Sequence, residues 1–175
     1  FFQRERVFIE NGNLKASLFL FDSGVHGIRI ENELGYIIAL PYQGQQIWDC
    51  SFLGRSLTMK SMFEDPVTNV GYLESYWAFL LHCGATAMGV PSANDNHPLH
   101  GELPNAEYRK AWLQVGEDEK GKFISLGGLY HHCIAFNTNY IAMPNIKVYE
   151  NSSIIDIAMT IENLKNTDME LMYMM

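Results

Sequence analysis

Short stretches that alternate apolar and polar residues recur along the chain, and this period of two constrains the fold more than any other feature. Turn residues separate the stretches, such as the Asp-Ser-Gly run at 22–24 and the Gly-Arg pair at 54–55. A spacing of about 8–12 residues is typical of all-β sandwiches and barrels. No window sustains a helical period over three turns. We therefore expect an all-β fold, with strands at residues 14–21, 25–30, 36–40, 46–52, 140–148, 154–162 and 169–175.

Two segments depart from this pattern. Aromatic side chains dominate residues 74–81, for which we expect a short helical or irregular piece. Residues 83–105 mix glycine and proline with Ser, Asn and Asp, and a long segment without periodicity is usually functional or disordered. Because aromatic residues flank it, we expect an ordered loop. The charged run at 117–122 predicts a solvated hairpin tip.

Charge and cysteine content exclude several classes of partner. The 175 residues include 20 Asp and Glu against 12 Lys and Arg, a net charge of -8, with no basic cluster. Nucleic acid and anionic membranes are therefore not expected partners. No apolar run approaches the roughly 20 residues that span a bilayer. Three widely spaced cysteines (Cys50, Cys83 and Cys133) indicate free thiols in a reducing cytoplasm.

Both ends of the sequence suggest a piece of a longer protein. The start, Phe1-Phe2-Gln3-Arg4, has no initiator methionine and no signal-peptide pattern, and the end is an apolar run at 172–175. We expect residues 1–175 to be the N-terminal portion of one β-sandwich domain. Because strands without partners expose sheet edges, we expect this portion expressed alone to lack a cooperative, monomeric thermal transition.

The strongest candidate for chemistry is His100, within the sequence HPLHGE at 97–102. Imidazole is the side chain best suited to proton transfer near neutral pH, and Gly101 allows the backbone to approach a ligand closely. We expect His97 at the rim of the site or behind it. The Glu102 carboxylate could accept ligand hydroxyls, orient His100 or form a salt bridge with Arg109.

This segment resembles the Leu-His-Gly-Gly segment of the galactose mutarotase-like superfamily, in which the His lines the sugar site. The runs QQIWD at 45–49, LHCG at 81–84 and HGE at 100–102 together resemble the aldose 1-epimerase-like branch of largely uncharacterised proteins. The resemblance extends from about Leu14 to the end of the chain. It implies a galactose-mutarotase-type antiparallel β-sandwich, or supersandwich. Glu102 stands where many mutarotases have a second glycine, a departure that concerns the substrate more than the fold.

The resemblance also implies a reaction. Superfamily enzymes interconvert the α and β anomers of free aldoses without a metal or organic cofactor. A carboxylate base removes the proton of the C1 hydroxyl while an imidazolium donates a proton to the ring oxygen, and the opened ring closes on its other face. His100 is the catalytic and substrate-binding residue that carries over. The second His and the carboxylate base are expected beyond Met175.

Other residues are candidates for binding the sugar together with His97, His100 and Glu102. His82 lies near the family's sugar-facing region, and Lys60 could replace the cation of an arginine-containing segment that this sequence lacks. Asn105 follows the His-Gly segment closely. Trp112 resembles the Trp that follows this segment in mutarotases, but a Trp in a β-sandwich is more often buried, and we expect it in the core.

Alternatives to the epimerase stay open. A non-catalytic carbohydrate-binding domain would share the fold, since a fold does not dictate function. A metal-dependent sugar isomerase would use His97, His100 and Glu102, and the His and Cys residues at 82–83 and 131–133 offer further ligand types. Side chains three apart on a strand point to opposite faces, so we expect no metal. A sugar-phosphate epimerase needs convergent cations, and only residues 60, 109 and 110 are near. The expected partner is a small-molecule sugar, with homo-oligomerisation left open.

Overall fold

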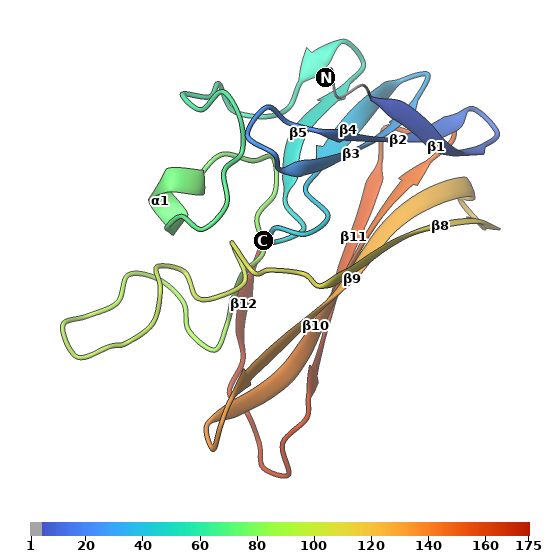
Figure 1. The fold of residues 1–175 in the computed structure, drawn as a ribbon. Helices are drawn as coiled ribbons and strands as arrows, with labels where there is room; N and C mark the ends of the chain where they lie inside the picture. The colour runs from blue at the N-terminus through green and yellow to red at the C-terminus, as the bar shows by residue number, and fades with distance from the viewer. Residues whose placement is uncertain (1–4) are drawn as a thin grey trace.

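A computed structural model describes residues 5–175, and residues 1–4 with their sequence-based interpretation lie outside it. The first of its sheets is a meander of six antiparallel strands in chain order (Figure 1). These strands are β1 (Arg6–Asn11), β2 (Leu14–Leu20), β3 (His26–Asn32), β4 (Gly35–Ala39), β5 (Ile47–Phe52) and β6 (Arg55–Ser56). Two-residue turns connect several of them, as the alternation of short apolar runs and turn residues predicts.

The second sheet has four antiparallel strands in the order β11-β10-β9-β8. They are β8 (Lys110–Asp118), β9 (Gly121–Ile134), β10 (Thr138–Tyr149) and β11 (Ile155–Asn163). A two-stranded ladder pairs β7 (Cys83–Ala85) with β12 (Met172–Met174), and the short helix α1 (Tyr72–Ser75) lies in the long connection between β6 and β7. Loops fill most of the chain between β6 and β8.

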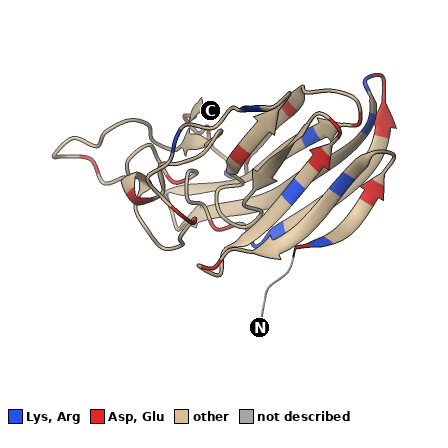
Figure 2. Cartoon of the chain, turned by 90° about the horizontal axis from the view of Figure 1, so that it is seen from above, with Lys and Arg blue, Asp and Glu red and all other residues tan. Residues whose placement is uncertain are grey.

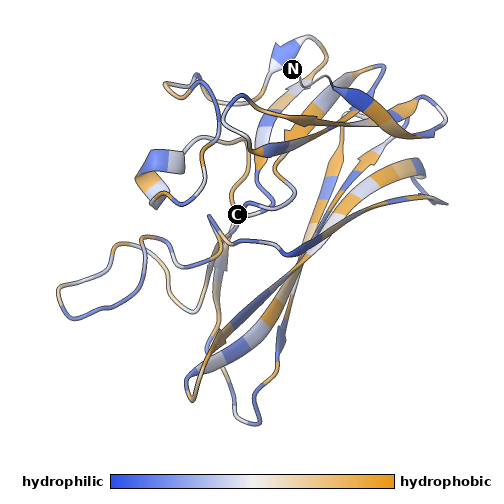
Figure 3. Ribbon diagram, viewed as in Figure 1, coloured by the Kyte–Doolittle hydropathy of each residue, from blue (hydrophilic) through white to orange (hydrophobic). Residues whose placement is uncertain are grey.

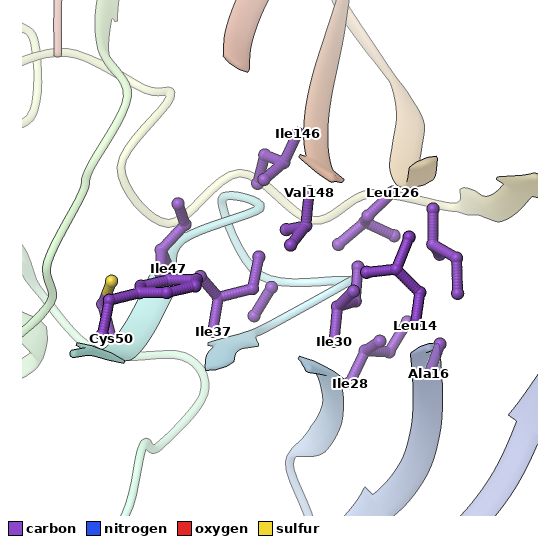
Figure 4. Packing of buried hydrophobic residues seen from close by; sticks show 13 residues of the cluster. Leu14, Ala16, Ile28, Ile30, Ile37, Ile47, Cys50, Leu126, Ile146 and Val148 are labelled. Atoms are coloured by element: carbon purple, nitrogen blue, oxygen red, sulfur yellow. The ribbon is translucent and has the colours of Figure 1, made fainter. Parts of the chain in front are cut away.

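The main core lies between the six-stranded and the four-stranded sheet (Figure 4). Strands β2 to β5, β9 and β10 contribute its buried apolar residues, mostly at alternate positions, because successive side chains of a strand point to opposite faces. The ribbon of Figure 3 shows this alternation. The buried members are Leu14, Ala16, Ile28, Ile30, Ile37, Ala39, Ile47, Cys50, Phe52, Ile124, Leu126, Ile146 and Val148. This arrangement is a β-sandwich.

The β9–β10 hairpin is long enough to serve two cores. One half of it faces the six-stranded sheet through residues such as Leu126 and Ile146, which are paired across the hairpin. The other half packs Tyr140 and Ala142 against the β7–β12 layer in a second cluster of buried residues. Pro144, which has no N–H to donate, lies where the ladder to β9 is interrupted without a change of register.

The structure confirms the expected all-β class and the antiparallel sandwich. Of the strands longer than three residues, sequence analysis does not single out β1, β8 or β9. The first two are edge strands whose residues are largely exposed, so their apolar pattern is weak. In β9 the consecutive residues 123–128 are all buried, so the period of two is hidden. The expected helical piece is displaced and short, because only residues 72–75 are helical. The expected strand at 169–175 is regular only over β12.

Lys and Arg are interspersed with Asp and Glu on the strands (Figure 2). The ion pairs include Lys147 with Asp118 and Lys120 with Asp156, which join β8, β10 and β11 around the hairpin tip. All three cysteines are free thiols. In the part of the chain that the structure describes, no helix is long and apolar enough to cross a membrane.

Candidate functional site

The backbone of the His100–Gly101 pair is pinned against β7. Both residues have a left-handed conformation, with φ of 60° and 82°. The N–H of Gly84 donates to the His100 carbonyl at 2.9 Å, and the His100 N–H donates to the carbonyl of Gly89 at 3.0 Å. A Cβ atom at position 101 would lie 2.5 Å from two backbone carbonyl oxygens, so only glycine fits there. The loop therefore presents His100 in one fixed position.

The His100 ring is half-buried and has a free nitrogen. It packs against the ring of Tyr72 in α1, with centroids 4.7 Å apart and planes inclined by 46°. Its Nδ1 is buried and has no hydrogen-bond partner among residues 5–175. Buried ring nitrogens are normally paired. The Nδ1 therefore keeps its capacity to hydrogen-bond a ligand or to exchange a proton with it, and, because it is buried, a ligand reaches it only when the side chains beside the ring move.

Tyr72 links His100 to a cavity of about 570 Å³. Tyr72 and Cys83 line this cavity with Tyr76 and the β12 residue Met174. Burial raises the pKa of the Tyr72 hydroxyl, and the neighbouring Cys83 adds to the shift. Burial likewise raises the pKa of the Cys83 thiol, so both groups are held neutral at physiological pH. The wall beside His100 is thus aromatic and mostly apolar.

Glu102 has its carboxylate fully engaged on the opposite side of the loop. The Tyr140 hydroxyl donates to its Oε1 at 2.5 Å, and the Thr86 N–H donates to the same oxygen at 3.1 Å. The Thr86 hydroxyl donates to Oε2 at 2.9 Å. Burial alone would raise the pKa of Glu102, but these hydrogen bonds outweigh it and hold the pKa below its ordinary value. The carboxylate ties the loop to β10, and the conceivable salt bridge to Arg109 is not formed.

His82 is fully buried and directly precedes β7 in the chain. Its Nδ1 lies 2.7 Å from the Tyr173 hydroxyl, while its Nε2 has no partner in the described part of the chain. Burial lowers the pKa of His82 to about 4, so the ring is neutral at physiological pH. Its ring stacks on that of Tyr173, with centroids 6.1 Å apart and planes inclined by 24°, and it does not line the cavity beside Tyr72.

The other sequence-predicted binding residues do not gather around His100. The Nδ1 of His97 lies 2.9 Å from the Pro98 carbonyl in an exposed part of the loop. Lys60 is exposed and lies in the connection after β6. Asn105 donates to the Ser75 hydroxyl at 2.8 Å and lines a different pocket, described below. The structure thus groups His100 with Tyr72 and Cys83. The other candidates lie at separate places and do not form a site with this group.

One further expectation, on Trp112, has a clear outcome. The expectation that Trp112 is a core residue is wrong, because 43% of its surface is exposed. It lies on the edge strand β8 opposite Gly127, where its indole covers the space that a side chain would occupy. Among the described residues no three His, Cys, Asp or Glu side chains converge into a group that could hold a metal ion. The ring of His131 instead bonds Asn139, and that of His132 bonds Tyr130.

Sequence reasoning misses the partners of these groups. Tyr72 is 28 residues from His100 in the chain, and Tyr140 is 38 residues from Glu102. A local signal exists for Tyr72, because Glu74 accepts a hydrogen bond from the Gly71 N–H at 2.9 Å and so starts α1. No signal in the sequence pairs Tyr140 with Glu102, since that contact depends on the packing of β10 beneath the loop.

A comparison with solved structures shows that the chain has a known fold. The chain matches the crystal structure of a protein from Klebsiella pneumoniae subsp. pneumoniae MGH 78578, which is described as a putative aldose 1-epimerase, with a TM-score of 0.76. The two proteins share a fold. Their sequences are 16% identical, and the match covers 90% of this chain and 45% of that protein, so the chain spans about half its length. No protein-family model matches the sequence, and no curated protein matches it significantly.

Proposed function

We propose that this chain carries the His-Gly loop of a carbohydrate-active isomerase that resembles an aldose 1-epimerase and interconverts the anomers of a free sugar. One observation carries the proposal: the His100 imidazole is fixed by its loop and leaves Nδ1 without a partner. The shared fold with a protein described as a putative aldose 1-epimerase supports the same function class.

In the proposed reaction His100 stabilises the opening of the sugar ring. A protonated imidazole donates a proton to the ring oxygen as the bond from that oxygen to C1 breaks, and a carboxylate takes the proton of the C1 hydroxyl. Glu102 is a poor candidate for that base, because three donors already occupy its oxygens. We assign Glu102 the structural role of holding the loop. We assign the catalytic base to no residue of this chain.

A non-catalytic carbohydrate-binding domain is the second candidate. The observation that favours it is that, within residues 5–175, His100 forms a ring contact with Tyr72 and neither a hydrogen bond nor an ion pair with any carboxylate. A binding domain needs no base, whereas an epimerase needs one from elsewhere.

NMR exchange spectroscopy of anomer interconversion separates the two. The full-length protein is measured with a panel of free aldoses, beside His100→Ala and a control, His131→Ala, whose exposed ring bonds Asn139 on the β9–β10 hairpin. An epimerase accelerates exchange for at least one sugar, and His100→Ala abolishes the acceleration while His131→Ala retains it. Binding of a sugar without acceleration would establish the binding domain instead. Acceleration that survives in His100→Ala would contradict the role of His100.

A further inference from the structure

A second, smaller pocket lies on another part of the sandwich, and no lining residue is shared with the cavity beside Tyr72. Its volume is about 250 Å³, and it is bounded by the turn that enters β3, by residues 68–69 and by the segment that follows the His100 loop. An isolated antiparallel bridge between Gln43 and Glu107 forms one edge. This edge is fixed further by the Tyr108 N–H, which donates to the Tyr42 carbonyl at 2.9 Å.

The amide groups at this pocket are held in place by the protein itself. Gln43 is buried, and its Nε2 donates to the Val67 carbonyl at 2.9 Å. Asn105 donates to the Ser75 hydroxyl at 2.8 Å and lies within 3.4 Å of the Gln43 amide. Groups that are positioned before a ligand arrives lose little conformational entropy on binding. The pocket is therefore a built cavity with preorganised polar groups.

The lining chemistry suits an uncharged polyhydroxylated ligand. Tyr42 is 43% exposed, and the His26 ring supports it edge-on, with centroids 5.3 Å apart and planes inclined by 89°. Such an aromatic wall packs against the apolar C–H face of a sugar ring. Around it, Asn69 and the Glu107 carboxylate supply hydrogen-bonding groups for hydroxyls.

Charge and size narrow the ligand class. No Lys or Arg lines the pocket, and Glu107 is an acid, so phosphate and carboxylate groups find no counter-charge there. The volume lies below the roughly 300–1,000 Å³ of pockets for drug-sized ligands, which leaves room for one sugar ring. We propose that this pocket, with Tyr42 as its platform, binds a neutral monosaccharide at a site separate from His100. This site does not rest on the proposed isomerase function.

Titration of the isotope-labelled full-length protein with D-galactose, D-glucose and D-glucose 6-phosphate tests the site by NMR chemical shifts. The variants are Tyr42→Ala and Glu107→Gln in the pocket and His100→Ala outside it. Trp112→Ala is the matched control, because Trp112 is an aromatic residue of the same exposed fraction that lies on β8 and does not line the pocket. Thermal unfolding of each variant checks the fold, which an exposed side chain is expected to leave intact.

The expected result is a shift of amide signals around Tyr42 with a neutral sugar, and a loss of affinity of about tenfold in Tyr42→Ala and in Glu107→Gln. Read from the amide signals around Tyr42, the control Trp112→Ala keeps the wild-type affinity, and His100→Ala, which alters only the separate His100 site, leaves the sugar-induced shifts at this pocket in place. Binding that disappears in His100→Ala and persists in Tyr42→Ala would assign the sugar to the His100 loop and overturn the proposal. Tighter binding of the sugar phosphate than of the neutral sugars would also overturn the proposal. So would the absence of shifts around the pocket at a roughly 50-fold excess of sugar in the mM range.

Discussion

Two buried tyrosines allow a comparison in which the hydroxyl oxygen is removed once from a hydrogen-bonded site and once from a site without a partner. Tyr140 and Tyr108 are almost fully buried, and both become Phe by loss of one hydroxyl. The Tyr140 hydroxyl donates to the Glu102 carboxylate at 2.5 Å, whereas the Tyr108 hydroxyl has no partner among the described residues. The two substitutions are therefore expected to change stability in opposite directions.

The magnitudes follow from hydrogen-bond energetics. A hydrogen bond to a charged group contributes about 1.5–3 kcal/mol, and Glu102 keeps its two donors from Thr86, so Tyr140→Phe should lower the free energy of unfolding by about 2 kcal/mol. A buried hydroxyl without a partner costs about 1–3 kcal/mol of desolvation, so Tyr108→Phe should be neutral or stabilise the protein by up to about 1 kcal/mol. Cavity effects are the same for both, since each substitution removes one oxygen atom.

Urea unfolding of the full-length protein, followed by tryptophan fluorescence, measures the difference, and an unchanged m value shows that the unfolded states of the variants are comparable. The pH dependence gives a second check. Hydrogen bonds lower the pKa of Glu102 in the folded protein. The stabilisation that Glu102 gives the fold is therefore fully present above the pKa of Glu102 in the unfolded chain, and it is lost as pH falls through the folded pKa. The gap between wild type and Tyr140→Phe should thus be constant near neutral pH and shrink in acid. Equal losses in the two variants, or a gap that widens in acid, would refute the reasoning.

Two more predictions concern the loop and the ladder beneath it. Gly101→Ala should destabilise the protein by well over 1 kcal/mol, because its Cβ meets backbone at 2.5 Å, whereas Gly89→Ala, at a similar positive φ but with open space, should cost only about 1 kcal/mol of strain. Chemical denaturation measures both, and equal effects would show that the close contact is unimportant. The ring protons of His82, observed by NMR, should not titrate between pH 8 and pH 5, because burial lowers its pKa to about 4. In the unfolded chain His82 binds a proton near pH 6.5. As pH falls from 6.5 to 4, His82 should therefore lower the free energy of unfolding by about 1.4 kcal/mol per pH unit. A titration of His82 near pH 6.5 would contradict its burial.

The fold is more predictable from this sequence than the site. Residues such as Ile28, Ile30, Leu126 and Ile146 alternate with polar neighbours, and that local period specifies which face of each strand is buried. His100 is likewise found from a local motif. What surrounds His100 is not, because the contact with Tyr72 forms between a helix of one turn and a loop, neither of which has a strong periodicity.

The polar candidates show why residue type alone is insufficient. Glu102 follows the His-Gly pair directly, yet its carboxylate turns to Tyr140 and Thr86, and Trp112 lies outside the core on an edge strand. In both cases the sequence indicates that a side chain is near the loop or the sheet, but the three-dimensional packing decides which side it occupies. A strand that lies at a sheet edge in the described chain leaves even an indole half in solvent.

The double use of the β9–β10 hairpin has a consequence for cooperativity. Leu126 and Ile146 belong to the sandwich core, and Tyr140, further along the same pair of strands, belongs to the core beneath the His100 loop. The two cores cannot come apart without breaking a ladder that runs through both. Amide hydrogen exchange on the two sides of Pro144 should consequently report a single opening free energy, so that the region around His100 is as persistent as the sandwich that supports it.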